Sequence, residues 1–184
     1  YADYVADLAG RFRVPRRLKV AVDCGNGSGS LVAERLLGAL GVDLVPLFCE
    51  SDGTFPNHHP DPTVDENLVD LIAAVRTHGC DLGIAFDGDA DRVGAVDEHG
   101  QVVRGDLILL LFGLDLLERK GKGQKLVFDV KCSQALPEVF GAAGGQPIMW
   151  KTGHSLMKEK MRETGAPLAG ELSGHICVGG DQYY

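Results

Sequence analysis

One local pattern occurs twice in this chain, and this repetition constrains the fold more than any other feature. The segments KVAVDCGNG (19–27) and KLVFDVKCS (125–133) are each a short apolar run that ends in aspartate and enters a loop. Each is followed by a helix pattern, a second strand, another helix and a third strand with a polar loop at its end. Helices between strands are the connections that parallel strands need. The sequence therefore predicts an α/β fold made of two related units.

The two predicted units carry different loops. We expect each unit to be a mixed, mostly parallel sheet flanked by helices, with residues 1–101 forming the first and residues 102–184 a second, truncated one. The loop after the third strand reads DGDADR (87–92) in the first unit and GELSGH (170–175) in the second. Because open α/β sheets bind ligands at the carboxyl ends of their strands, both loops are candidate sites.

Local signals also predict a hairpin and two helix starts. The segment VGAVDEHGQVV (93–103) indicates two short strands joined by a turn. Thr63 and Glu66 have the spacing of a capping box, and Asp106 is a predicted N-cap for the apolar helix that follows it. Both helices should therefore begin just after these side chains.

Charge, hydropathy and cysteine content exclude several classes of protein. The net charge of −8 argues against nucleic acid as a partner. No run reaches the roughly 20 apolar residues that span a bilayer and no signal peptide opens the chain, so we expect a soluble, cytoplasmic protein with no membrane partner. The five scattered cysteines favour neither a disulfide framework nor a zinc site. Because the chain begins at Tyr1 and stops soon after an apolar run, we expect an excerpt of a longer protein.

Three aspartates at alternate positions, Asp87, Asp89 and Asp91, follow an apolar strand pattern. Converging carboxylates repel one another, and a divalent cation removes that repulsion. Oxygen ligands without cysteine or histidine favour Mg²⁺, Ca²⁺ or Mn²⁺ over zinc. An EF-hand is excluded because Arg92 occupies the position of the required glycine and the flanks are strand-like. A cation beside an arginine instead suits phosphoryl transfer, whereas a merely solvated acidic turn is less consistent with apolar flanks.

The loop VDCGNGSGS (22–30) indicates an alternative function. It fits the D-x-G-x-G-x-G pattern of S-adenosylmethionine-dependent methyltransferases, with Glu50 in the place of the acid that holds the ribose. The simpler interpretation is a tight turn from strand to helix, in which glycines adopt positive φ. We favour the turn, because a methyltransferase does not account for the loops that follow.

Polar and ionisable side chains also gather at the predicted strand ends of the second unit. They are Lys131, His154, Glu171, Ser173 and His175. A carboxylate with a hydroxyl two residues later suits neighbouring sugar hydroxyls, and lysine and histidine can bind phosphate. The sequence GELSGH lacks the G-x-S-x-G pattern of a hydrolase, so a nucleophilic serine is not expected there.

Taken in order, the motifs FPNHHPDP, FDGDADR, FDVKCS, WKTGHS and GELSGH resemble the α-D-phosphohexomutase family, in its phosphomannomutase/phosphoglucomutase branch. The resemblance covers essentially the whole chain. In that family four domains surround one cleft, and this chain corresponds to the second domain and most of the third. The resemblance implies interconversion of hexose 1-phosphate and hexose 6-phosphate, with glucose or mannose as the sugar, through a phosphoserine and a bisphosphorylated intermediate.

The resemblance also implies a role for each loop. The Mg²⁺ ligands would be Asp87, Asp89 and Asp91. The substrate-binding residues would be Lys131, Thr152, Gly153, His154, Glu171, Ser173 and His175. Arg92 would lie beside the reacting phosphate, Glu171 and Ser173 would hold sugar hydroxyls, and Lys131 or His175 would carry the proton. The candidate catalytic residues are therefore Arg92, Lys131 and His175.

Two departures from the family pattern limit what this chain can do by itself. No serine in it is followed by His-Asn, as the family's phosphoserine is, and the C-terminal phosphate-binding loop is absent. We therefore expect the chain to be inactive alone and to need the flanking domains of its parent. A non-catalytic sugar-phosphate-binding module is the remaining alternative. Leu172 within GELSGH is typical of the glucose and mannose branch.

Overall fold

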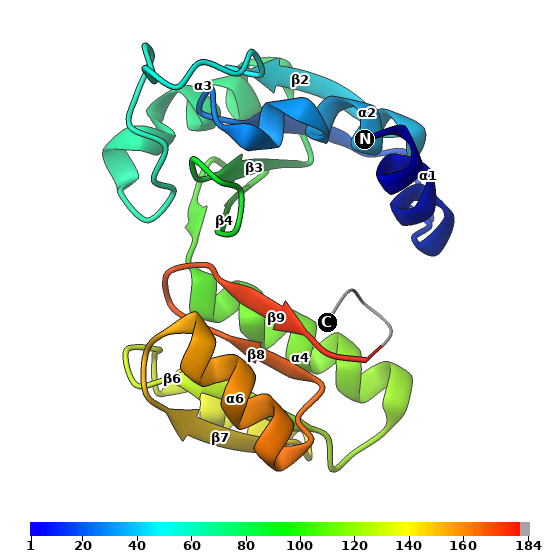
Figure 1. Ribbon diagram of the computed structural model, residues 1–184, viewed down its shortest axis with the longest axis vertical. Helices are drawn as coiled ribbons and strands as arrows, with labels where there is room; N and C mark the ends of the chain where they lie inside the picture. Colours follow the sequence, from blue (N-terminus) through cyan, green and yellow to red (C-terminus); the bar gives the residue numbers. More distant parts are fainter. Residues whose placement is uncertain (181–184) are drawn as a thin grey trace. The chain divides into compact units, whose positions relative to one another are not determined.

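The computed structural model describes residues 1–180. Contacts between residues divide the chain into two compact units, Tyr1–Val103 and Arg104–Tyr184. Each unit has its own sheet, and helices pack on both faces of each sheet (Figure 1). The predicted α/β fold with two units is therefore confirmed.

The first unit is built on a five-stranded mixed sheet with the strand order β2-β1-β3-β4-β5. Its strands are β1 (Lys19–Asp23), β2 (Asp43–Leu47), β3 (Leu82–Phe86), β4 (Val93–Asp97) and β5 (Val102–Val103). Its helices are α1 (Ala2–Arg11), α2 (Ala33–Ala39) and α3 (Val69–His78), with 3-10 turns η1 (Ser28–Leu31) and η2 (Asp65–Leu68). Strand β1 pairs in parallel with β2 and β3, and β4 forms the predicted hairpin with β5.

Successive residues of β1 point to opposite faces of the first sheet, as a strand requires. Ala21 is fully buried in the cluster that Leu71 and Val75 of α3 form on one face. Val22 is fully buried on the other face against Ala33 of α2. Helix α1 packs on α2. Strand β1 therefore contributes to the hydrophobic core on both faces of the sheet.

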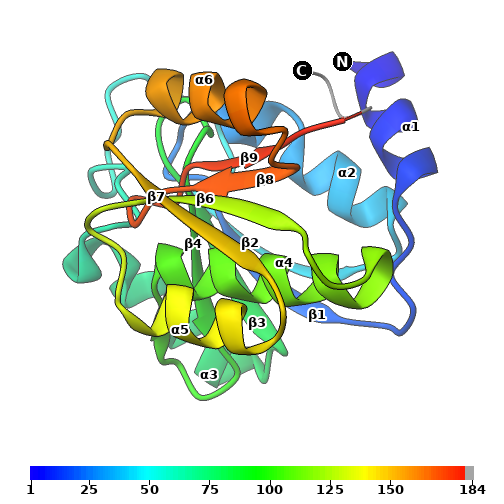
Figure 2. The ribbon, with the colours of Figure 1, turned by 90° about the horizontal axis from the view of Figure 1, so that it is seen from below.

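The second unit contains a four-stranded sheet with the strand order β7-β6-β8-β9. Its strands are β6 (Lys125–Asp129), β7 (Gln146–Trp150), β8 (Leu168–Gly170) and β9 (Ile176–Val178). Its helices are α4 (Gly105–Lys120), α5 (Ala135–Ala142) and α6 (His154–Thr164). Figure 2 shows α6 on one side of this sheet and α4 with α5 on the other. Phe128 of β6 packs with Phe140 of α5, whereas its neighbour Val127 packs with Met157 of α6.

The predicted repeat is confirmed by the order and direction of the strands. In both units the first strand of the repeat lies between the second and the third and pairs with each in parallel, and the fourth is antiparallel to the third. Asp23 ends β1 opposite Leu47, and Asp129 ends β6 opposite Trp150. The two aspartates therefore occupy equivalent positions. Strand β5 has no counterpart within residues 104–180.

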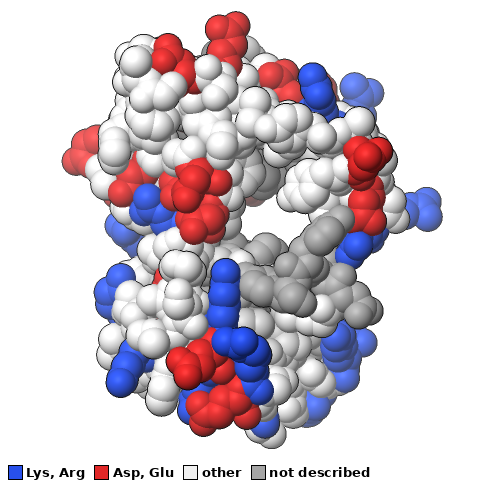
Figure 3. All heavy atoms as spheres, in the orientation of Figure 1, with Lys and Arg blue, Asp and Glu red and all other residues white. Residues whose placement is uncertain are grey.

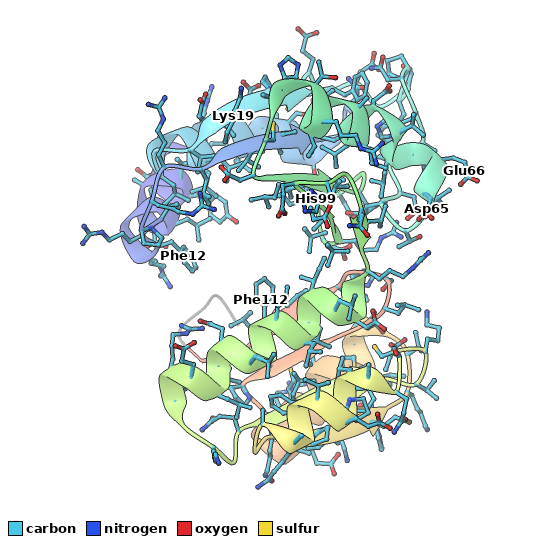
Figure 4. All side chains as sticks on the ribbon, turned by 180° about the vertical axis from the view of Figure 1, so that it is seen from behind. Phe12, Lys19, Asp65, Glu66, His99 and Phe112 are labelled. Carbon is cyan, nitrogen blue, oxygen red and sulfur yellow. The ribbon has the colours of Figure 1, made fainter. Side chains whose placement is uncertain are left out.

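Both predicted helix caps are wrong. The hydroxyl of Thr63 donates to the carboxylate of Asp61 at 2.7 Å, and Figure 4 shows Glu66 pointing away from the first unit. Helix α4 has Arg104 at its N-cap, and Asp106 lies buried in the first turn, where its Oδ2 accepts the backbone N–H of Ser133 at 2.7 Å. The hydroxyl of Thr63 and Oδ2 of Asp106 are thus each bound to another partner, and neither side chain caps its helix.

The described surface carries charges of both signs. Figure 3 shows acidic and basic side chains interspersed over the face that it presents, in both units. None of the helices within residues 1–180 is long and apolar enough to span a membrane.

Candidate functional site

The acidic loop follows β3 directly, at the carboxyl end of the parallel strands. Asp87 is 3% exposed, whereas Asp89 and Asp91 are exposed to solvent. One carboxylate oxygen from each of the three lies within 4.8 Å of the others. Ala90 adopts a positive φ of 62°, which curls the loop so that side chains at alternate positions can converge. The predicted convergence of the three carboxylates is therefore present in the structure.

Arg92 links the acidic loop to the proline-rich loop (residues 55–62). Its Nε donates to Oδ2 of Asp87 at 2.7 Å, and its Nη1 donates to Oδ1 of Asp61 at 3.0 Å. Burial alone would lower the pKa of Arg92 and raise that of Asp61. The two carboxylates nevertheless hold the pKa of Arg92 above its usual range, and bonds from Thr63 and Arg92 hold the pKa of Asp61 below its own. Arg92 is therefore a fixed positive charge beside the three aspartates.

Two further contacts attach the proline-rich loop to the ends of the strands. His58 Nε2 lies 3.0 Å from Oδ2 of Asp23, and the amide of Asn57 donates to Oδ1 of Asn26 at 2.7 Å. Asp23 is 1% exposed, and this burial raises its pKa, partly offset by the N–H of Gly25 and by His58. The loop is therefore held on the same sheet edge as the acidic loop.

The glycine loop (22–30) is a turn from strand to helix. This is the interpretation that we favour over the cofactor-binding loop of a methyltransferase. Gly25 and Asn26 both have positive φ. A β-carbon on Gly27 would lie 2.7 Å from the carbonyl oxygen of Gly88, and one on Gly25 would lie 2.8 Å from the ring of Pro60. The glycines therefore leave room for the protein's own loops, and the methyltransferase alternative is not supported.

In the second unit, Asp129 joins three loops at the end of β6. It is fully buried, and its Oδ1 accepts hydrogen bonds from the thiol of Cys132 at 3.0 Å and the N–H of Leu172 at 3.2 Å. Its Oδ2 accepts the hydroxyl of Thr152 at 2.9 Å and lies 3.8 Å from Nζ of Lys131. Burial and the neighbouring carboxylate raise the pKa of Cys132 well above its usual range, so this thiol remains a donor.

The GELSGH loop forms a compact set of polar contacts around Glu171. This side chain is 2% exposed, and its two oxygens contact the N–H of Gly153 and Nδ1 of His175, the latter at 2.9 Å. Oγ of Ser173 lies 2.9 Å from the same Nδ1, and the rings of His154 and His175 lie 5.8 Å apart. The loop after β7 and the loop after β8 are therefore joined through the buried carboxylate of Glu171.

The predicted site residues fall into two groups, one in each unit. Asp87, Asp89, Asp91 and Arg92 share one loop of the first unit. The predicted substrate-binding residues lie at the ends of β6, β7 and β8, where Lys131 is half exposed and contacts Asp129. Sequence reasoning did not identify Asp23 and Asp129 as supports of these loops. Their one signal was their shared place at the end of each repeated strand.

The chemistry of the two groups differs. Three carboxylates with no histidine or cysteine among them are the donors that a hard divalent cation prefers, so the residues of the first unit fit Mg²⁺. The second group offers a carboxylate, a hydroxyl, imidazoles and an ammonium group. This combination can bind sugar hydroxyls and phosphate.

Comparisons with known proteins give matches over both units. Residues 1–100 match the model of "Phosphoglucomutase/phosphomannomutase, alpha/beta/alpha domain II", and residues 104–184 match that of domain III. A phosphomannomutase/phosphoglucomutase of Pseudomonas putida is 53% identical over 175 residues, which are 95% of this chain and 38% of the relative. The chain thus spans well under half the length of that relative.

Solved structures give the same fold. The crystal structure of a phosphoglucomutase/phosphomannomutase family protein from Burkholderia thailandensis has a TM-score of 0.94 at 48% identity, over 99% of this chain and 40% of its own. The N-acetylphosphoglucosamine mutase of Aspergillus fumigatus, solved with GlcNAc-6P and magnesium, has a TM-score of 0.63 at 18% identity, over 97% of this chain and 39% of its own. At that identity the second likeness concerns the fold alone.

Proposed function

The chain belongs to the phosphoglucomutase/phosphomannomutase family, and on this premise we propose that it supplies the Mg²⁺-binding and sugar-binding loops of a phosphohexomutase. The parent enzyme would interconvert hexose 1-phosphate and hexose 6-phosphate through a phosphoserine and a bisphosphorylated sugar. Because the chain spans 38% of the Pseudomonas putida relative, the phosphoserine and the second phosphate-binding loop would come from other parts of the parent.

The observation that carries this proposal is the convergence of Asp87, Asp89 and Asp91 beside Arg92 at the end of β3. The three aspartates would hold Mg²⁺, because carboxylates without histidine or cysteine are the ligands that a hard divalent cation prefers. When bound, Mg²⁺ would offset negative charge on the transferring phosphoryl group. Arg92 would add a second positive charge, which its bonds to Asp87 and Asp61 keep in a fixed orientation.

The second unit would bind the sugar. Glu171 and Ser173 would form hydrogen bonds with neighbouring sugar hydroxyls, while His154 and Lys131 would bind phosphate. Lys131 and His175 are the candidate proton carriers. The contact of Nδ1 of His175 with Glu171 fixes the orientation of the imidazole. We propose glucose and mannose phosphates as substrates.

The cation site can be tested on the chain itself by titration calorimetry with Mg²⁺. Asp89→Asn should weaken binding by about tenfold, because it removes one charged ligand from a site with few others. Asp115→Asn is the matched control, since it removes the same charge from an exposed position of α4 that pairs with Arg119. Equal affinities for wild type and Asp89→Asn would refute the site.

The activity can be tested on the full-length parent with a coupled assay of glucose 1-phosphate conversion, primed with glucose 1,6-bisphosphate. We expect no turnover by the 184-residue chain. In the parent, Glu171→Gln should lower kcat/KM about 10- to 100-fold, since charge-assisted hydrogen bonds are lost at nearly constant volume. Glu163→Gln, on the exposed end of α6, should leave kcat/KM unchanged. Turnover by the chain alone, or an unaltered Glu171→Gln parent, would contradict the proposal.

A further inference from the structure

Two cysteine thiols face each other at the edge of the first sheet. Cys24 follows the last residue of β1, and Cys49 lies two residues beyond the end of the neighbouring strand β2. Their sulfur atoms are 3.4 Å apart. Two backbone hydrogen bonds join the segments that carry these cysteines. The N–H of Cys24 donates to the carbonyl of Leu47 at 3.2 Å, and the N–H of Asn26 donates to the carbonyl of Phe48 at 2.8 Å. The sulfurs are therefore held close by paired strand ends.

The two thiols differ in access to solvent. Cys24 is fully buried against Val22 and Ala33, whereas Cys49 is partly exposed. Cys49 also lines a cavity of about 360 Å³, together with Asn26, Glu34, Pro46, Phe48, Glu50 and Asn57. A small polar reagent can therefore reach Cys49 through this cavity, whereas Cys24 is fully buried.

The hydrogen bond between the thiols makes their acidities unequal. It raises the pKa of Cys24, as does burial, so Cys24 keeps its proton. The same bond lowers the pKa of Cys49, although burial and the charge of Glu34 oppose this. The thiolate is the reactive form of cysteine, and the exposed member of this pair forms it more readily.

The other cysteines have different surroundings. Cys80, Cys132 and Cys177 are all buried. Burial raises the pKa of Cys80, and burial with the bond to Asp129 raises that of Cys132. Low pKa, access and a neighbouring thiol are the features of oxidant-sensitive cysteines, and Cys49 combines all three.

We propose that Cys49 is a site of oxidation by hydrogen peroxide and that Cys24 resolves it to an intramolecular disulfide. The Cys49 thiolate attacks one oxygen of the peroxide, the O–O bond breaks, and the leaving oxygen takes a proton to become water. The Cys24 sulfur then attacks the sulfur of the Cys49 sulfenic acid, which releases the hydroxyl group with the Cys24 proton as a second water. Two thiols lose two electrons, and the peroxide is reduced to two waters.

Peptide mapping of the chain tests this directly, because trypsin places each cysteine in a different peptide. Cys24 lies in residues 20–35 and Cys49 in residues 36–76. After excess hydrogen peroxide, alkylation of remaining thiols and digestion without reductant, these two peptides should appear joined, about 2 Da below their summed mass. The reductant dithiothreitol should separate them. Cross-links that join other cysteines, or recovery of Cys24 and Cys49 as free thiols, would overturn the proposal.

Variants separate the two roles. Cys49→Ser should abolish the cross-link and leave Cys24 unoxidised. Cys24→Ser should leave Cys49 as a sulfenic acid that dimedone traps, and Cys80→Ser should cross-link like wild type. Because a change at buried Cys24 can disturb folding, wild-type alkylation rates provide a second measurement. Iodoacetamide at neutral pH should modify Cys49 about tenfold faster than the other four cysteines. Equal rates would contradict its assignment as the reactive thiol.

Discussion

Asp23 in the first unit and Asp129 in the second end equivalent strands, and both carboxylates are buried, but they bind their loops differently. Asp23 pairs with one imidazole and one backbone N–H, those of His58 and Gly25. Asp129 receives a thiol, a hydroxyl and a backbone N–H and also lies near the ammonium group of Lys131. The same strand topology thus accommodates two different sets of polar partners around the equivalent aspartate.

This difference indicates how the two units acquired different chemistry on one topology. In the first unit the aspartate holds the proline-rich loop, and the acidic loop is supported separately by Arg92. In the second, the aspartate bonds Leu172, which lies inside the GELSGH loop. The candidate sugar loop is therefore attached to the sheet more directly than the candidate metal loop, and its geometry should depend more strongly on its aspartate.

The largest expected effect concerns the separate cores. Phe140→Ala should lower the free energy of unfolding of the second unit by about 3–5 kcal/mol, because Phe140 is fully buried among α4, α5 and β6. Trp150 is the one tryptophan of the chain and ends β7, so its fluorescence reports on this unit. Leu71→Ala, a change of similar kind in the first core, should leave the urea midpoint of Trp150 fluorescence unchanged. A shift of that midpoint would show that the cores are not separate.

Asparagine substitutions test the two aspartates themselves. Asp129→Asn should lower the free energy of unfolding by about 2–3 kcal/mol, because an amide N–H₂ group would face hydrogen-bond donors that now bind a carboxylate. Asp23→Asn should change stability by less than about 1 kcal/mol, because its oxygen can still accept from Gly25 and its N–H₂ can donate to Nε2 of His58. Urea unfolding followed by Trp150 fluorescence and by far-UV circular dichroism measures both. Similar losses for the two variants would contradict the comparison.

A pH series sharpens the same contrast. Burial raises the pKa of Asp23, so the folded unit binds this proton more tightly than the unfolded chain does. The resulting stabilisation is complete below the ordinary carboxyl pKa of about 4 and is lost as the pH rises through the raised value. Asp23→Asn has no such loss. Its stability relative to wild type should therefore be higher at pH 7 than at pH 4, and the opposite trend in urea midpoints would contradict the direction of the shift.

The smallest expected effect lies at Trp150. Nζ of Lys160 lies 4.1 Å from the centre of the indole ring and 2.8 Å from Oε1 of Glu163. Lys160→Gln should lower the free energy of unfolding by about 0.5–1 kcal/mol and change the Trp150 emission spectrum, since a cation over the ring is lost. Glu163→Gln removes the ion pair but keeps the cation, so its emission should match wild type. The equivalent position in the first unit is Leu47, which offers no such contact.

Sequence reasoning predicted what depends on neighbours along the chain. The repeated order of strand and helix patterns that begins at β1 and again at β6 predicted the two sheets. The spacing of Asp87, Asp89 and Asp91 predicted the acidic cluster within one loop. Contacts between distant segments were not predicted. His58 meets Asp23 across 35 positions and Arg92 meets Asp61 across 31, and such pairs depend on how whole loops pack. The wrong cap at Thr63 has a local cause instead, since Asp61, two residues earlier, accepts its hydroxyl.

The close approach of Gly27 to Gly88 has a consequence for evolution and for protein engineering. A side chain at position 27 would strike the carbonyl between Asp87 and Asp89, so it would displace two candidate metal ligands together. A side chain at position 27 therefore requires a matching change in the acidic loop, and the two segments should be inherited as one block. A designer who transfers DGDADR into another α/β scaffold needs to transfer the turn that ends the neighbouring strand with it.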